Sequence, residues 1–352
     1  MELGIDRFVF ANFPSSSGMT PVEELLEEIE LADRLGIDVY GIGEHHTDEF
    51  LDSAPVVLLA AAAARTKRIR LTSAISVLSA ADPVRLFEEF STLDLISRGR
   101  AEIVVGRGAY AEAFSLFGLD VRHYDSLFEE KLDLLLRLRK GGPVEWSGKH
   151  RPTLTGQKIT PRPEQDVLPV WLGATGSPES FVRAGTLGLP LALGTIGGEL
   201  ASLRPLVDLY RAAGRHAGHD LERLTVGVHA IGYVSENKPA ALEEFFPAYM
   251  AVFGGIARKL GRPEPTFESF DRASGPTSAL VVGSAQEVAS KIRLIDEILG
   301  GVSRVSLQMS VGPLERQLRL RAIELLANEV GSVVKADHTI EVAHPLACRG
   351  YR

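Results

Sequence analysis

Apolar runs of strand length alternate with amphipathic stretches along this 352-residue chain, and this alternation constrains the fold most. Eight runs are rich in branched apolar residues, and most are followed by apolar residues at helical spacing. We expect strands over residues 3–10, 37–42, 69–75, 101–105, 167–172, 189–193, 224–234 and 302–308. Strands separated by helices pair in parallel with right-handed crossovers, and eight of them close into a barrel. The sequence therefore predicts an α/β fold, a (β/α)8 TIM barrel, with a doubly wound open sheet as the alternative.

A single domain is expected to cover residues 1–352, because neither a linker nor a repeat interrupts the pattern. Insertions are expected near residues 106–123, 141–167 and 236–280. The second has several prolines and no helical period, which indicates a loop or a small hairpin. The third is rich in aromatic residues and is expected to be partly helical. After a last helix over about 313–330, we expect the remaining residues to form an ordered tail packed on the barrel.

The charge balance and the cysteine content exclude several classes of protein. With 38 Lys and Arg against 46 Asp and Glu, the net charge is −8, and no basic run is longer than Lys67-Arg68, so nucleic-acid binding is not expected. The single cysteine, Cys348, allows no intrachain disulfide, which favours a reducing compartment. The longest apolar stretch, residues 54–64, is too short to span a bilayer, and the N-terminus lacks the pattern of a secretion signal. We therefore expect a cytoplasmic protein without membrane contact.

Polar or glycine-rich segments follow four of the expected strands. In a barrel the chemistry lies at the C-terminal ends of the strands, so these segments are candidates for the functional site. They read Glu44-His45-His46, Ser73-Ala74-Ile75-Ser76, Gly106-Arg107-Gly108-Ala109-Tyr110 and Gly173-Ala174-Thr175-Gly176-Ser177-Pro178.

The two histidines of the first segment are candidates for proton transfer rather than metal binding. Adjacent residues after a strand point to opposite sides, and the spacing lacks the H-x-H and H-E-x-x-H patterns of metal sites. No metal is therefore expected, although Asp48 and Glu49 lie nearby. We expect one histidine to face inward as a proton donor and the other to pack or to bond the backbone. The alternative is a pair of structural histidines.

Two of the segments indicate an anion site. Gly106-Arg107-Gly108 begins a G-x-G-x-x-A spacing, but it follows the fourth strand rather than the first, and its arginine suggests a cation that reaches a phosphate or carboxylate. Gly176 and Ser177 stand at a helix start, where free N–H groups and the helix dipole stabilise phosphate. A ligand phosphate between this helix and Arg107 would explain both features. The alternatives are a glycine hinge and plain helix capping by Ser177.

Taken together, these segments resemble the bacterial luciferase-like flavin monooxygenase family. Further stretches of the resemblance are Thr72-Ser73-Ala74-Ile75 through Asp82-Pro83-Val84-Arg85, Leu95-Ile96-Ser97-Arg98-Gly99-Arg100, Trp171-Leu172-Gly173-Ala174, Gly188-Leu189-Pro190 and Gly283-Ser284. They cover nearly the whole chain in the order of the strands. The resemblance implies a (β/α)8 barrel with insertions.

The resemblance also implies roles for individual residues. His45 matches the catalytic histidine of the family, and a non-prolyl cis peptide is expected between Ala74 and Ile75 beside the flavin ring. The implied cofactor contacts are Arg107 to the phosphate, Tyr110 close to the cofactor, Thr175, Gly176 and Ser177 completing the phosphate cradle, and Thr195 near the ring or the substrate. Gly106 stands where true luciferases keep a reactive cysteine, so light emission from a long-chain aldehyde is not expected. Thr175 and Gly176 replace a Glu-Ser pair of luciferase.

The activity implied by the resemblance is a two-component flavin monooxygenase. Reduced FMN, delivered by a separate NAD(P)H-dependent flavin reductase, would react with O₂ to oxygenate a small-molecule substrate. A homodimer formed through helices of the early half of the barrel is also implied. The alternatives are a deazaflavin-dependent dehydrogenase of the same fold, a non-catalytic flavin-binding barrel and a metal-dependent hydrolase. The sequence leaves the substrate open.

Overall fold

The computed structural model describes residues 1–11, 18–108 and 111–342, with the backbone alone for residues 337–342. Tyr110 and Cys348 therefore lie outside the described residues. Eight parallel strands close into a barrel in the order β1, β2, β3, β5, β8, β9, β10 and β12. They are β1 (Glu2–Arg7), β2 (Val39–Ile42), β3 (Arg70–Ser73), β5 (Ala101–Gly106), β8 (Val170–Ala174), β9 (Leu191–Thr195), β10 (Val226–Ser235) and β12 (Arg304–Ser310). All eight expected strands are present, so the barrel is confirmed and the open-sheet alternative is wrong.

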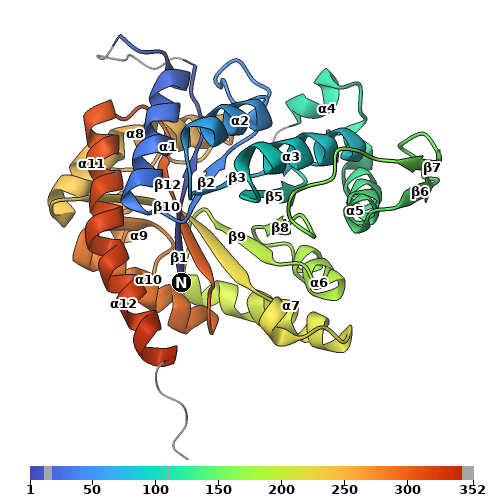
Figure 1. The fold of residues 1–352 in the computed structure, drawn as a ribbon. Helices are drawn as coiled ribbons and strands as arrows, with labels where there is room; N and C mark the ends of the chain where they lie inside the picture. The colour runs from blue at the N-terminus through green and yellow to red at the C-terminus, as the bar shows by residue number, and fades with distance from the viewer. Residues whose placement is uncertain (12–17, 109–110, 343–352) are drawn as a thin grey trace, which may run out of the picture.

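Helices surround the barrel, as Figure 1 shows. Those between successive barrel strands are α1 (Pro21–Leu35), α2 (Pro55–Arg65), α3 (Pro83–Ser97), α5 (Tyr124–Lys140), α6 (Pro178–Leu187), α7 (Arg204–His216) and α10 (Ala285–Leu299). Capping boxes begin α1 at Thr20 and α10 at Ser284, and each places a Glu side chain on the N-cap backbone. Leu25 and Ile29 lie on the buried face of α1, as their helical spacing predicts.

The remaining elements lie in the connections. They are β4 (Ser76–Val77), α4 (Glu112–Leu116), η1 (Val121–His123), the antiparallel hairpin of β6 (Pro143–Trp146) and β7 (Leu154–Lys158), η2 (Leu200–Leu203), η3 (Leu221–Arg223), α8 (Lys238–Lys259), α9 (Phe267–Ala273) and β11 (Val281–Ser284). The hairpin and the partly helical third insertion match the expectations. The sequence did not predict β11, which adds to β10 outside the closed barrel. Its four residues run directly into the capping box of α10, which hid the strand signal.

The C-terminal helix is longer than expected. After α11 (Arg316–Leu325) the chain forms a π-helical turn, η4 (Leu326–Val330), and continues as α12 (Gly331–Val342). The predicted end at residue 330 is therefore wrong, because Gly331 keeps a right-handed helical conformation with φ −60° and does not stop the helix. Val334 is buried, and the Lys335 ammonium lies 2.9 Å from an Asp38 carboxylate oxygen, so this part of the segment packs on the barrel as expected.

Helices α1 and α11 lie side by side (Figure 1). Arg319 of α11 forms ion pairs with Glu24 and Glu28 of α1, the second at 2.7 Å, and all three side chains are buried. Glu28 also accepts Arg7 of β1 at 2.9 Å. Charge pairs of this kind join the two ends of the helical layer where the barrel closes. Over the described residues, no helix is both long and apolar enough to cross a membrane.

Candidate functional site

Near the C-terminal ends of the strands, one side of the barrel interior is formed by glycines and one isoleucine. We call this level of the interior the upper layer. Gly106 of β5 and Gly173 of β8 leave the space that the Ile75 side chain occupies. A Cβ at Gly106 would lie under 3.0 Å from Ile75, and one at Gly173 would lie 3.3 Å from it. Ile75 packs on the interior side chains of Val104 and Trp171. The Ala74–Ile75 peptide bond is cis, as the resemblance implies, so the expected backbone feature is present after β3.

His45 is held by a buried carboxylate beside this layer. Its Nδ1 lies 3.0 Å from Oδ1 of Asp52, and the other oxygen of Asp52 accepts the Val9 backbone N–H at 2.9 Å. The ring stacks on Phe50 at 4.0 Å between centroids and meets the edge of Phe8 at 4.4 Å. With Nδ1 donating to Asp52, Nε2 is an acceptor in the neutral ring and a donor in the imidazolium. The pair has the composition of a proton-transfer group.

His46 has its own acid. Its Nε2 lies 2.9 Å from Oε1 of Glu44, whose second oxygen accepts the Val77 N–H at 3.0 Å. The ring also packs edge-on against Phe117. The expected packing is confirmed, whereas the alternative of a bond to the backbone is wrong, because the neighbouring carboxylate takes the ring nitrogen. Within the described ranges, no cluster of three or more His, Cys, Asp and Glu side chains is arranged to hold a metal ion.

Arg107 follows β5, and its guanidinium is paired with a carboxylate. Nη1 donates to Oδ1 of Asp125 at 2.7 Å, and the guanidinium carbon lies 5.3 Å from the centre of the Tyr124 ring. The Tyr124 hydroxyl donates to the Gly108 carbonyl at 2.6 Å, and burial raises the pKa of that hydroxyl. Gly108 has a φ of +84°, which a glycine adopts without strain. Tyr110, expected near the cofactor, lies outside the described residues.

At the start of α6, the hydroxyl of Ser177 is a second donor that is paired with a carboxylate. Ser177 is the N-cap residue, but its hydroxyl does not accept a helix N–H, so the alternative of plain capping by this side chain is wrong. It donates instead to Oε2 of Glu179 at 2.7 Å. This bond, with a smaller contribution from the charge of Arg107, lowers the pKa of Glu179. β5 and β8 pair in parallel, so the two segments that carry the anion signals follow neighbouring strands at the same end of the barrel. Thr175 and Gly176 are exposed, and no atom comes within 4 Å of where a Gly176 Cβ would lie.

Thr195 ends β9 and leads to a pair that sequence reasoning missed. Its hydroxyl donates to the backbone carbonyl of His229 in β10 at 3.4 Å. Nδ1 of His229 lies 2.6 Å from Oδ2 of Asp6 in β1. The sequence features that point to this pair are an acid, Asp6, in the apolar first strand and a histidine, His229, in the apolar seventh strand. Neither signal alone indicates a contact between residues 223 positions apart.

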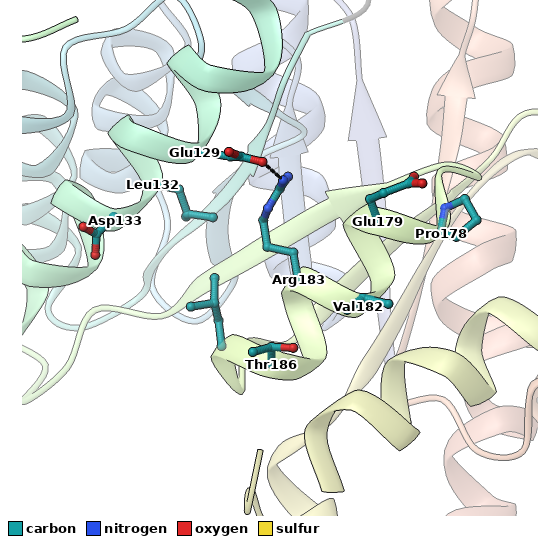
Figure 2. A pocket seen from close by; sticks show the side chains of 9 residues that line it. Glu129, Leu132, Asp133, Pro178, Glu179, Val182, Arg183 and Thr186 are labelled. Atoms are coloured by element: carbon teal, nitrogen blue, oxygen red, sulfur yellow. Dashed lines mark hydrogen bonds and ion pairs between the residues drawn. The ribbon is translucent and has the colours of Figure 1, made fainter. Parts of the chain in front are cut away.

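A groove of about 600 Å³ lies on the outer side of this region, between α5 and α6 (Figure 2). Arg183 and Glu129 form an ion pair across it. The groove is lined by Glu129, Leu132, Asp133, Pro178, Glu179, Val182, Arg183, Thr186 and Leu187. Of the sites described above, it shares only Glu179 with the anion site and does not include His45 or Ile75.

The model of the luciferase-like monooxygenase family matches residues 3–300. The chain belongs to this family. The match runs from β1 through α10 and therefore includes every strand end described above except that of β12.

Several relatives of this luciferase-like family member are monooxygenases. The 4-hydroxyprotoasukamycin monooxygenase of Streptomyces nodosus subsp. asukaensis is 27% identical, over 93% of this chain and 92% of that protein. The oxygenase component of the flavin-dependent trigonelline monooxygenase of Acinetobacter baylyi is 25% identical, over 88% of each chain. The crystal structure of monooxygenase RslO1 from Streptomyces bottropensis has a TM-score of 0.83 and 26% identity, over 94% of this chain and 99% of that one.

More distant luciferase-like structures share the fold alone. At 20% identity they include the oxygenating constituent of 3,6-diketocamphane monooxygenase from Pseudomonas putida in complex with FMN. They also include a tetrahydromethanopterin reductase from Methanopyrus kandleri that depends on coenzyme F420. The fold therefore serves both kinds of cofactor and does not choose between them.

Proposed function

We propose that this chain is the oxygenase of a two-component system that uses reduced FMN and O₂ to oxygenate a small organic substrate. The observation that carries the proposal is the meeting of three features at the strand ends. The Ile75 side chain fills the space left by Gly106 and Gly173, a buried His45–Asp52 pair follows β2, and Arg107 and Ser177 present donors to anions. The flavin-dependent monooxygenases among the relatives support the same activity.

The donors at the anion site fit a flavin phosphate. Arg107 and Ser177 each hold a carboxylate oxygen at 2.7 Å, and a carboxylate is the protein group most like a phosphate oxygen pair. The Asp125 and Glu179 side chains are well exposed, so a phosphate can replace both without leaving a buried charge unpaired. The N-terminus of α6 adds its dipole. Arg107, Thr175, Gly176 and Ser177 would hold the phosphate, together with Tyr110.

The ring end of the cofactor would lie against Ala74, Ile75 and Thr195. Bound FMN, once reduced, supplies the electrons with which O₂ is activated. The residues of this chain then have three tasks. Ile75 gives the ring an apolar support, Phe8 and Phe50 keep water from the His45 ring, and Asp52 orients that ring so that Nε2 holds or delivers a proton.

The proposal includes a partner and a setting. A separate NAD(P)H-dependent flavin reductase would supply the reduced FMN, which agrees with a relative that is itself named an oxygenase component. A homodimer and a cytoplasmic location complete the proposal, as the family resemblance and the composition imply.

Flavin binding tests the proposal, with riboflavin as the matched ligand that lacks the phosphate. We expect FMN binding to quench the tryptophan fluorescence of the chain. Riboflavin should bind more weakly than FMN. Arg107→Ala should weaken FMN binding about tenfold or more, because a charge-assisted contact is lost, and should leave riboflavin binding unchanged. Arg215→Ala, which removes an exposed arginine of α7, is the control.

The outcomes separate the candidate activities. With NADH and a flavin reductase, the native chain should alter O₂ consumption and peroxide release, and His45→Ala should change the peroxide yield while FMN still binds. Absence of flavin binding would refute the proposal. Tighter binding of a deazaflavin than of FMN would assign the chain to the dehydrogenase alternative. Equal behaviour of His45→Ala and the native chain in every flavin reaction would leave a non-catalytic flavin-binding barrel.

A further inference from the structure

The upper interior of the barrel has a polar side that the residues proposed so far do not use. Asp6 of β1 and His229 of β10 join across β12, with Nδ1 of His229 2.6 Å from Oδ2 of Asp6. Asp6 is 4% exposed, and its other oxygen, Oδ1, is buried without a hydrogen-bond partner among the described residues. An ionised or polar group in this state costs free energy, so the pair is not explained by packing alone.

The pair lies next to the cis peptide. Oδ1 of Asp6 and Cβ of Ala74 both border the space that a side chain at Gly41 would fill, with the Ala74 atom 2.8 Å from that Cβ position. Because Gly41 has no side chain, the Asp6 carboxylate and Ala74, the residue that precedes the cis bond, border the same space. The Asp6–His229 pair thus belongs to the same layer as Ile75, on the opposite side of the barrel from Arg107.

His229 is the accessible member of the pair. Its side chain is 15% exposed, whereas that of Asp6 is almost fully covered. Nδ1 is taken by Asp6, and Nε2 makes no hydrogen bond within the described part of the chain. Asp6 therefore orients the ring, and Nε2 is the atom that a ligand can meet.

The opposite wall of this layer is apolar. Ile75 covers Gly106 and Gly173, and its neighbours below are Val104, Trp171 and Ala192. A molecule between the two walls would meet hydrocarbon on one side and a single imidazole on the other. This asymmetry favours a ligand with an apolar body and one hydrogen-bonding oxygen.

We propose that His229, oriented by Asp6, binds a hydroxyl or carbonyl oxygen of the substrate through Nε2. The neutral ring accepts the O–H of a hydroxyl at Nε2, and the imidazolium donates Nε2–H to a carbonyl oxygen. The inference rests on the proposed function, because it identifies the class of substrate for the same barrel interior. His229 is then a specificity residue, and Asp6 is a positioning residue that acts through it. Hydrocarbons that lack an oxygen are poor ligands because they leave Nε2 without a partner in a largely desolvated site.

Paired probes test this inference on the FMN-loaded protein. Phenol and benzene, naphthol and naphthalene, and cyclohexanone and cyclohexane differ within each pair by one oxygen function, and ligand-observed NMR gives their dissociation constants. We expect the native chain to bind the oxygen-bearing member of at least one pair about tenfold more tightly. His229→Leu should abolish this ratio while FMN affinity stays at the native value. His216→Leu, at an exposed position of α7, is the matched control.

Variants of Asp6 test the positioning role. Asp6→Asn keeps an acceptor for Nδ1 and should retain most of the ratio, whereas Asp6→Leu should lose it with FMN affinity unchanged. A purely structural role would move FMN affinity and stability together and would not move the ratio selectively. Three results would overturn the inference: equal binding within every pair, a ratio that survives His229→Leu, or no binding of any probe to the FMN-loaded chain. If the native chain does not bind FMN, the proposed function fails, and the same ratios measured without flavin judge the inference alone.

Discussion

At the scale of single residues, Ile75 fits in the barrel interior because Gly106 and Gly173, the strand positions that face it, have no side chains. Gly106 is the tightest of these positions, since a Cβ there would overlap the Ile75 side chain. In the sequence, this position stands out as the start of the Gly106-Arg107-Gly108 motif and as the place where true luciferases keep a cysteine. The structure gives the glycine a steric reason that does not depend on that resemblance.

We predict that Gly106→Ala lowers the free energy of unfolding by about 1–3 kcal/mol, because the added methyl group overpacks the barrel interior. FMN affinity should fall with it, since Ile75 must move. Urea unfolding and fluorescence titration measure the two effects. Gly197→Ala is the control, because a Cβ there meets nothing within 4 Å and its φ is not in the left-handed region. Equal stability of the two variants would contradict the close packing of Ile75 on Gly106.

At the scale of elements, two buried lysines attach helices to loops. The Lys131 ammonium of α5 donates to the Ser79 carbonyl at 2.7 Å, and Lys291 of α10 donates to the carbonyls of Gly275 and Leu280. Burial lowers the pKa of each from 10.5 to about 8. Neither helix gave a sequence signal for this, because both lysines look like ordinary polar residues of an amphipathic helix.

These pKa values predict how stability depends on pH. Between pH 8 and 10.5 the unfolded chain binds a proton at each lysine that the folded chain has largely released, so the free energy of unfolding rises with pH in that window. Below that window both states are protonated and the contribution is constant. Lys131→Met should flatten part of the rise, whereas Lys140→Met, at an exposed position of the same helix, should not. Urea unfolding of the three proteins across this pH range decides the matter, and parallel curves for the native chain and Lys131→Met would count against it.

At the scale of the whole molecule, an ion cluster centred on the buried pair Arg304–Glu102 joins four strands at the N-terminal end of the barrel. Arg304 of β12 lies 2.7 Å from Glu102 of β5 and also pairs with Glu2 of β1, while Glu102 pairs with Arg70 of β3 at 2.6 Å. The Arg304 guanidinium also lies 4.6 Å from the Trp171 ring centre. Burial alone would raise the pKa of Glu102, but the two arginines outweigh it and lower that pKa. Stability from this carboxylate is therefore present above the usual pKa of a glutamate and is lost only in stronger acid.

We predict that Glu102→Leu lowers the free energy of unfolding by about 3–5 kcal/mol, because it leaves the Arg304 charge buried without its main partner. The double variant Glu102→Leu with Arg304→Met should be more stable than the single variant, since both buried charges are then gone. Chemical denaturation of the three proteins measures this. A double variant no more stable than Glu102→Leu would show that the arginine is satisfied without Glu102.

The fold could be predicted from the sequence because its signals are local. Each barrel strand is a short apolar run, and each following helix has its own period and cap, so the eight units can be recognised one at a time. The errors have local causes as well. β11 is too short to separate from the capping box of Ser284, and a π turn followed by a helical Gly331 hides the continuation of the last helix.

The candidate site could be predicted only as a set of positions. His45, Arg107 and Ser177 were found because they follow strands, and parallel strands bring such positions to one end of a barrel. Their partners Asp52, Asp125 and Glu179 were not found, because which acid meets which donor depends on how the loop of Asp52 and the first turns of α5 and α6 are placed around the strand ends.

By itself, the sequence determined the barrel, the end of it that carries the chemistry and the family resemblance, since these follow from periodicity and from motifs read along the chain. Only the tertiary structure decided that Ile75 lies over Gly106 and that Asp6 meets His229 across β12. The physical reason is that a closed barrel places residues from distant strands at contact distance. Hydrogen bonding and packing between them depend on the register of the strands and on the glycines that leave space between them. Neither can be predicted from a local stretch of the sequence.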